Sequence, residues 1–230
     1  MSTQLSTANA ISLEKELIWF SSVLDTRIAL YFEHDTSESE GEKIFGSIEE
    51  IPTPDLSNDD SAYGSIVSDL DLGFDERILL ALTLVPHIRP DLLDLFFTRN
   101  KNFDRGFTQF GGWKGESHGG FIPTCETAAF IIAGNDLSKR FKLLSYFEGD
   151  GILIKNSILT LEHKSSGEPF MSAAVRISSE YLNRLTSGVY QKPDYSMNFP
   201  AKLIKTKLTW DDLILPMEVQ EEIENIITWI

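Results

Sequence analysis

Residues 102–127 constrain the fold of this chain most strongly, because glycine and aromatic side chains are interleaved there at high density. The stretch reads NFDRGFTQFGGWKGESHGGFIPTCET and holds six of the 15 glycines. Glycine permits positive φ angles and close backbone approach, and it is entropically costly to order. Aromatic rings that pack on the body of a domain can offset that cost. The composition therefore predicts a folded loop rather than a flexible linker.

The loop leads into two short helices. Pro123 and Thr124, followed by the sequence CETAAFIIAG, indicate a helix start and a stop at Gly134. Asp136 stands where it can cap a second helix, LSKRFKLLSYF. That helix carries four apolar residues that we expect on one buried face: Leu137, Phe141, Leu144 and Phe147.

The N-terminal part of the chain has a clear helical period over residues 11–32. Apolar residues recur at three- and four-residue steps: Leu13, Leu17, Phe20, Leu24 and Ile28. We assign residues 1–33 as an N-terminal amphipathic helix capped by Ser12, with residues 1–10 frayed. Its apolar face could pack on its own domain, on a second copy of the chain or on a partner, and the period alone favours its own domain.

Residues 34–72 form an acidic, serine-rich segment that Pro52 and Pro54 interrupt. Such a composition buries too little apolar surface to repay the entropy of ordering, so the segment is predicted to be a disordered linker. It serves either as a spacer or as an acidic mimic or tethering segment, and the spacer needs fewer assumptions.

Residues 74–97 resume helix formation, with Asp75 as the expected N-cap and Pro90 at the start of a second helix. Two runs rich in β-forming residues, 151–163 and 169–178, are separated by the turn-like KSSGE and predict a hairpin. Three helices followed by a hairpin are the order of a winged helix. We therefore assign residues 73–177 to a winged-helix-type domain with a glycine-rich loop.

The remaining residues, 178–230, are assigned to a second small α/β portion. The sequence SSEYLNRLTSG predicts a helix that ends at Gly188, and Pro216 begins an apolar helical phrase that runs to Ile230. Because this helical segment has no stop signal, we expect the chain to be part of a longer protein. The fold class is α+β, mainly α.

Composition excludes several classes of function. The formal net charge of −15 opposes binding to phosphate backbones, so we expect no nucleic-acid partner. A single cysteine, Cys125, excludes an intramolecular disulfide and a cysteine-cluster metal site. The chain has neither a signal-peptide pattern nor an apolar run long enough for a bilayer. We expect a cytoplasmic protein without a membrane partner.

The motifs that carry common chemistries are absent from the sequence. A P-loop requires lysine directly after the last glycine, whereas Lys114 here precedes Gly115 and an acidic residue follows. The four histidines do not have metal-ligand spacing, and neither HExxH nor GxSxG occurs. We expect no metal and no catalytic residue in this chain.

The polar residues of the glycine-rich loop allow three interpretations. Arg105, Lys114, Glu116 and His118 could form a small hydrolase site, with His118 as a general base oriented by Glu116. They could also stabilise the loop internally. The third interpretation is a docking surface, since Trp113 and Arg105 are residue types enriched at interface hot spots.

Several segments, taken together, resemble one protein family. They are FDRGFTQFGGWKGESHGGFIPTCETAAFIIAG, ERILLALTLVPHIRPDLLDLFF, SSEYLNRLTSG and NFPAKLIKTKLTWDDLILP. The chain resembles the N-terminal, winged-helix-type region of bacterial AAA+ ATPases associated with contractile injection systems of the antifeeding-prophage kind. One departure is Cys125, where the family pattern has a smaller residue.

The resemblance implies a non-catalytic region that recognises a client or adaptor for assembly, loading or remodelling of the injection system. ATP and Mg²⁺ would bind in an AAA+ module beyond Ile230, which would also drive hexamer formation. The residues expected to contact a partner are Arg105, Phe107, Trp113, Lys114 and His118. The alternatives are a winged-helix DNA-binding regulator and a small hydrolase that uses the glycine-rich loop.

Overall fold

The computed structural model describes residues 2–32, 45–102, 104–115, 117–165 and 167–189, together with positions 219, 222 and 223. The chain divides into two compact units, Met1–Lys192 and Pro193–Ile230. The predicted C-terminal helix from Pro216 lies almost entirely outside the described residues. The first unit is α+β and mainly helical, with small antiparallel hairpins, which confirms the predicted class.

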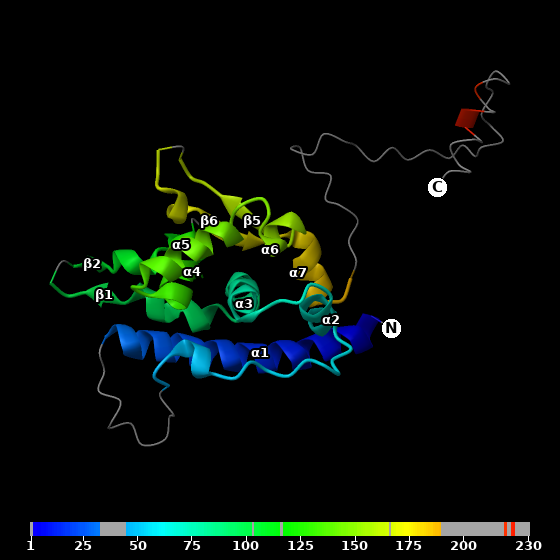
Figure 1. Cartoon of the computed structure of the whole chain (residues 1–230), viewed down its shortest axis with the longest axis horizontal. Helices are drawn as coiled ribbons and strands as arrows, with labels where there is room; N and C mark the ends of the chain where they lie inside the picture. Colours follow the sequence, from blue (N-terminus) through cyan, green and yellow to red (C-terminus); the bar gives the residue numbers. More distant parts are fainter. Residues whose placement is uncertain are drawn as a thin grey trace. The chain divides into compact units, whose positions relative to one another are not determined.

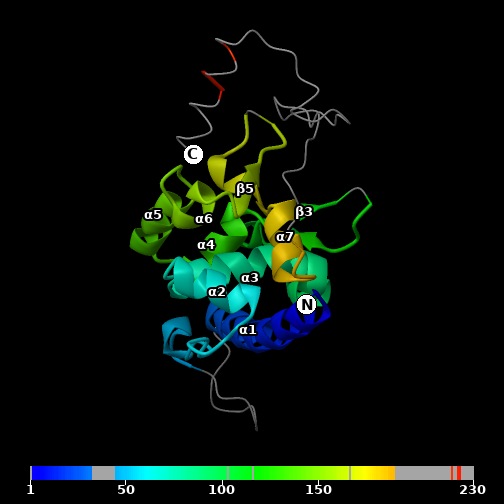
Figure 2. The same cartoon turned by 90° about the vertical axis from the view of Figure 1, so that its right-hand side faces the viewer.

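Helix α1 (Ser2–Tyr31) lies along one side of the first unit, and α3 (Phe74–Ile88) lies in the middle (Figures 1 and 2). The opposite side holds α5 (Leu137–Tyr146), α6 (Ile152–Lys155) and β5 (Leu159–Glu162). The apolar face of α1 is buried in the unit's own core, as the helical period predicts: Leu13, Leu17, Phe20, Val23 and Leu24. The expected N-cap at Ser12 is wrong, and so is the expected fraying over residues 2–10, because α1 begins at Ser2 and Ser12 lies inside it. Asn9 is fully buried, and its side chain accepts from Ala62 N at 2.8 Å and donates to Arg184 O at 3.0 Å. These bonds hold the first turns of α1 in the fold.

The predicted disordered linker is ordered over residues 45–72, whereas residues 33–44 lie outside the described part. It contains the 3₁₀ turn η1 (Ile48–Glu50) and helix α2 (Ala62–Asp69), which Ser61 caps by accepting from Gly64 N at 2.9 Å. Although the segment is acidic on average, its few apolar side chains are buried in the core: Ile48, Ile51, Leu56, Ala62, Tyr63, Ile66, Val67 and Leu72.

Helix α3 (Phe74–Ile88) is the central helix, and nine consecutive side chains from Arg77 to Val85 are buried. The predicted N-cap Asp75 is wrong, because Gly73 occupies the N-cap position. The carboxylate of Asp75 instead accepts a hydrogen bond from Tyr146 at 3.1 Å. The second helix expected in this region is the 3₁₀ segment η2 (Pro90–Phe97).

The glycine-rich loop folds as two short hairpins joined by a 3₁₀ turn. Strand β1 (Arg99–Asn100) pairs with β2 (Arg105–Gly106), and β3 (Trp113–Lys114) pairs with β4 (Phe121–Ile122). The turn between the hairpins is η3 (Thr108–Phe110).

Helix α4 (Cys125–Ala133) follows the loop and begins with a capping box between Thr124 and Thr127. Helix α5 (Leu137–Tyr146) is capped by Asp136, as predicted, through bonds to the main-chain nitrogens of the first turn. The predicted buried face of α5 is wrong in its first half. Leu137 and Phe141 are 64% and 67% exposed, because the helix turns a different face, centred on Leu143, towards α4.

The expected hairpin forms from β5 (Leu159–Glu162) and β6 (Ala174–Ile177), which pair antiparallel. The residues that were expected to begin its first strand form the short helix α6 (Ile152–Lys155) instead. The connection back to β6 includes the 3₁₀ turn η4 (Phe170–Ser172). Helix α7 (Ser179–Leu185) then packs with the first unit, although the sequence had placed it in the C-terminal portion.

Candidate functional site

A cleft of about 440 Å³ lies where the glycine-rich loop meets the connection between β5 and β6. Its lining combines apolar, hydroxyl and charged groups: Thr108, Gly111, Gly112, Trp113, Thr124, Glu126, Lys164, Glu168, Pro169, Met171 and Ser172. A bridge between Thr124 and Ala174 joins the two segments that form the walls. The cleft thus combines segments that lie about 50 residues apart in the sequence.

Main-chain and hydroxyl groups hold the loop wall in place. Gly112 N donates to Thr124 Oγ1 at 3.1 Å, and Thr127 Oγ1 donates to Phe110 O at 2.8 Å. Gly112 has a φ of +85°, and a Cβ atom there would overlap the ring of Phe121. Because the capping box of α4 also supplies these hydroxyls, the position of Trp113 is fixed by the start of that helix.

The rings of Phe107 and Phe110 pack the loop against neighbouring helices. The buried ring of Phe110 lies 4.8 Å from Phe130 of α4 and 5.4 Å from Phe96 of η2, between ring centroids. Phe107 is half-buried, and its centroid lies 5.4 Å from that of Phe32. Edge-to-face packing of this kind stabilises aromatic clusters beyond their buried area. These contacts pack residues 107–110 of the loop against the helices, as the interleaved aromatic residues predict.

Trp113 forms one wall of the cleft and is half-buried. The ammonium of Lys164, from the opposite wall, lies 4.6 Å from the centroid of its indole ring, within range of a cation–π interaction. Glu126 also lines the cleft and accepts two hydrogen bonds from Arg140 Nη2, at 2.6 and 2.7 Å. Glu168 adds a second carboxylate to the lining.

The five residues predicted to contact a partner are dispersed over the loop. Trp113 is the one among them that lines this cleft. Arg105 lies in the other hairpin, and it is exposed, as are Lys114 and His118. Glu116, the orienting carboxylate of the hydrolase alternative, lies outside the described residues. The opposite wall of the cleft, from Lys164 to Ser172, was not identified from the sequence, because no local pattern connects it to the loop.

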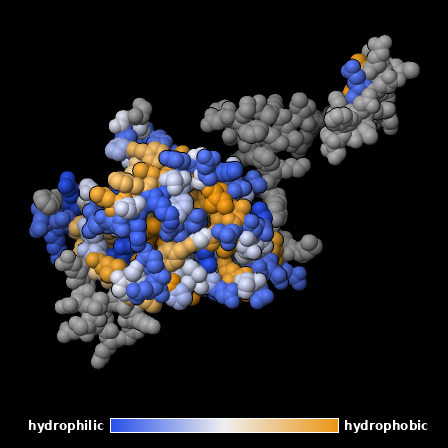
Figure 3. All heavy atoms as spheres, in the orientation of Figure 1, coloured by the Kyte–Doolittle hydropathy of each residue, from blue (hydrophilic) through white to orange (hydrophobic). Residues whose placement is uncertain are grey.

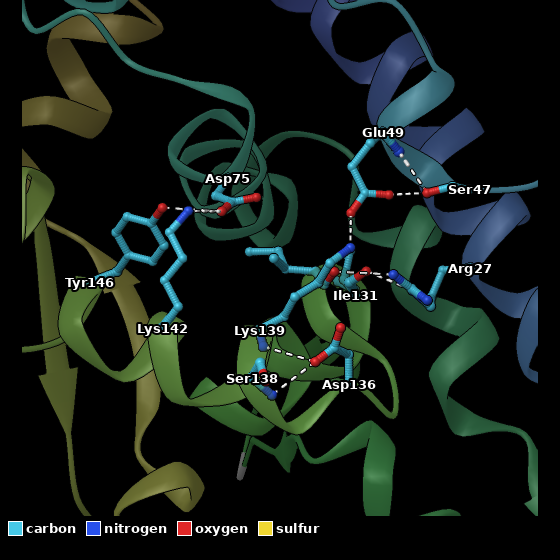
Figure 4. A network of polar contacts seen from close by, with 11 residues as sticks. Arg27, Ser47, Glu49, Asp75, Ile131, Asp136, Ser138, Lys139, Lys142 and Tyr146 are labelled. Atoms are coloured by element: carbon cyan, nitrogen blue, oxygen red, sulfur yellow. Dashed lines mark hydrogen bonds and ion pairs between the residues drawn. The ribbon is translucent and has the colours of Figure 1, made fainter.

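A second hollow, of about 370 Å³, lies at the start of α3 and is lined by paired charges. Figure 4 shows these pairs. Lys139 pairs with Glu49, and Lys142 lies 3.6 Å from Asp75. These pairs connect α5 to η1 and α3. The charged side chains that line this hollow are therefore better explained as ion pairs that hold the helices together than as ligand-binding groups.

Burial shifts the pKa of titratable groups in the fold, Cys125 and His87 among them. Burial raises the pKa of the Cys125 thiol to about 12, so this group stays protonated near neutral pH. Burial also lowers the pKa of His87, and the positive charges of Arg176 and His118 add to that effect. Within the part of the chain that the structure describes, no three His, Cys, Asp or Glu side chains converge as metal ligands.

The surface offers mixed polarity. Apolar and polar residues alternate on the face shown in Figure 3, and the apolar residues gather in several small patches. No helix among the described residues is both long enough and apolar enough to cross a membrane.

No protein-family model, curated protein or solved structure matches this chain.

Proposed function

We propose that this chain is a protein-recognition region that docks a client through the Trp113 cleft. The observation that carries the proposal is a tryptophan held by a well-packed loop at the wall of an open cleft. Tryptophan is enriched at interface hot spots, particularly where a fixed side chain meets a pocket. A docking site needs this arrangement, whereas catalysis needs a nucleophile or a base with an orienting partner.

The resemblance to the N-terminal regions of AAA+ ATPases supplies the setting of the proposal. The chain would recognise a component or effector of a contractile injection system and present it to an AAA+ module in the cytoplasm. That module would bind ATP and Mg²⁺, form the hexamer and perform the hydrolysis. The order α3, η2 and α4, followed after α5 and α6 by the β5–β6 hairpin, is the observation that favours a winged-helix type of core.

The DNA-binding alternative has less support. In the predicted winged-helix order α4 is the third helix, which would have to enter a DNA groove. Eight of the nine residues of α4 are buried in the core, so its surface is not available for base contacts. The net charge of −15 opposes the same function.

Binding of the chain to purified sheath, tube, baseplate and effector proteins, measured by biolayer interferometry, tests the proposal. We expect one component to bind, and Trp113→Ala to weaken that binding by about 30-fold or more, as for a hot-spot residue. Ile18→Ala is the matched control, since Ile18 is an exposed apolar residue of α1. Binding to none of the components, or ATP hydrolysis by this chain alone at a motor-like rate, would overturn the proposal.

A further inference from the structure

The indole face of Trp113 is already occupied by a cation of the chain itself. The Lys164 ammonium lies 4.6 Å from the ring centroid, and Lys164 is an exposed residue of the connection between β5 and β6. An ammonium group over the face of tryptophan is the preferred geometry of a cation–π contact. The contact shows that this wall of the cleft accepts a positively charged side chain.

Two carboxylates, Glu126 and Glu168, line the cleft together with the indole. Glu126 is already ion-paired with Arg140 of α5 at 2.6 Å. Glu168 is exposed and accepts a hydrogen bond from the hydroxyl of Ser172 at 3.2 Å, so it is the carboxylate of the lining that is available to a second cation. An aromatic face with nearby carboxylates is the usual composition of a site for an ammonium or guanidinium group.

The charge of the whole chain favours the same class of partner. With a formal net charge of −15, the protein attracts cationic segments over the range set by ionic screening. Complementary charge raises the association rate and selects between partners. A basic segment is therefore steered towards the chain, and the cleft offers a specific place for one of its side chains.

We infer that the Trp113 cleft binds a lysine or arginine side chain of a basic segment in the partner protein, and that Lys164 occupies this place in the free chain. The partner's cation displaces Lys164 when it binds, so Lys164 lowers the affinity of the cleft. This inference rests on the proposed docking role and adds the chemistry of the docked group.

The opposite role for Lys164 makes a different prediction. If the contact with Trp113 mainly clamps the β5–β6 connection against the loop, then removal of Lys164 loosens the cleft and weakens binding. If Lys164 competes with the partner, its removal strengthens binding. The sign of the effect of one substitution therefore separates the two roles.

The experiment uses a fluorescein-labelled hexalysine peptide and the full chain, with affinity measured by fluorescence anisotropy at two ionic strengths. Lys101→Ala is the matched control for Lys164→Ala, because Lys101 is also exposed and its replacement changes the net charge equally. We expect Lys164→Ala to bind about two- to fivefold more tightly than Lys101→Ala, the range of an exposed cation–π contact. Trp113→Leu should abolish that difference, and circular dichroism melting should confirm that each variant is folded.

Equal affinities of the two lysine variants, or weaker binding by Lys164→Ala, would overturn the inference. A failure of this kind leaves the docking role itself open to its own test, because the peptide assay contains no injection-system component. Conversely, tighter peptide binding by Lys164→Ala would still show that Lys164 competes for a cation site, even if none of the sheath, tube, baseplate or effector proteins bound.

Discussion

The guanidinium of Arg27 in α1 donates a hydrogen bond from Nε to the main-chain oxygen of Ile131 in α4, at 2.7 Å (Figure 4). Its Nη2 donates to Ile132 O at 3.1 Å. The last carbonyls of a helix have no partner within the helix, and a basic group there also interacts favourably with the helix dipole. One arginine thus caps the C-terminus of a helix that lies about 100 residues further along the chain, and it joins the N-terminal helix to α4, whose first turn contributes Glu126 to the cleft.

The first prediction concerns Gly134, which ends α4 beside Arg27. Its φ is +54°, and a Cβ atom there would lie 2.7 Å from Nη1 of Arg27. Gly134→Ala should lower the free energy of unfolding by about 2 kcal/mol, through left-handed strain and displacement of the guanidinium. Urea denaturation measures this change. Gly149→Ala is the control, because nothing lies within 4 Å of that site, and an equal loss in both variants would contradict the explanation.

The second prediction concerns the buried ion pair between Glu16 and Arg77. Two bonds, at 2.9 and 2.6 Å, connect α1 to α3, and both side chains are almost fully buried. Arg77→Met alone should lower the free energy of unfolding by about 3–5 kcal/mol, because it leaves a buried carboxylate without its partner. The double variant Glu16→Leu/Arg77→Met should be more stable than Arg77→Met. A double variant whose loss in free energy of unfolding equals the sum of the losses in Glu16→Leu and Arg77→Met would contradict this account of the pair.

Local sequence patterns predicted some elements of this fold and missed others. The N-caps Thr124 and Asp136 and the apolar period of α1 depend on near neighbours, so they could be recognised locally. The order of residues 45–72 could not, because an acidic average conceals single side chains such as Ile48 and Tyr63 that are buried by distant helices. Residues 152–155 have strand-forming side chains, yet they form a helix in the tertiary context.

The candidate site was predictable to the same limited extent. Trp113 stood out because the glycine-rich loop is unusual in composition. The wall that carries Lys164 and Met171 is brought to the loop by the pairing of β6 with the start of α4, which no local pattern indicates. The exposure of Phe141 likewise depends on which face of α5 meets α4.

The third prediction concerns the reactivity of Cys125. The thiol is buried, and its pKa of about 12 keeps it protonated at pH 8, so the nucleophilic thiolate is scarce. We expect no measurable reaction with Ellman's reagent in the native protein and complete reaction in denaturant. Rapid labelling under native conditions would show that the start of α4 is open to solvent.

The fourth prediction concerns the pH dependence of stability at Glu49. Partial burial raises the pKa of this carboxyl, but hydrogen bonds from Lys139 and Ser47 outweigh that effect and lower the pKa to about 2. Because the folded-state pKa is depressed, the contribution of Glu49 is present above its unfolded pKa, near 4.5, and is lost as the pH falls towards 2.

Comparison of the wild-type chain with Glu49→Gln tests this prediction by urea denaturation between pH 7 and pH 2. The wild type should be more stable at pH 7 by up to about 1 kcal/mol, since the pair is solvent-screened, and the difference should vanish at the acid end. Asp94→Asn is the control, as Asp94 is an exposed carboxylate of η2. A difference that grows as the pH falls would contradict the assignment.

The central claim is that a protein partner binds at the Trp113 cleft, and hydrogen–deuterium exchange of the full chain tests it most directly. Exchange would be compared with and without each purified sheath, tube, baseplate and effector protein. The account predicts that one of them slows exchange in both walls of the cleft, residues 108–113 and 164–172, and that Trp113→Ala removes this protection. Binding that slows exchange only in α1 or α5, with both walls unchanged, would contradict it.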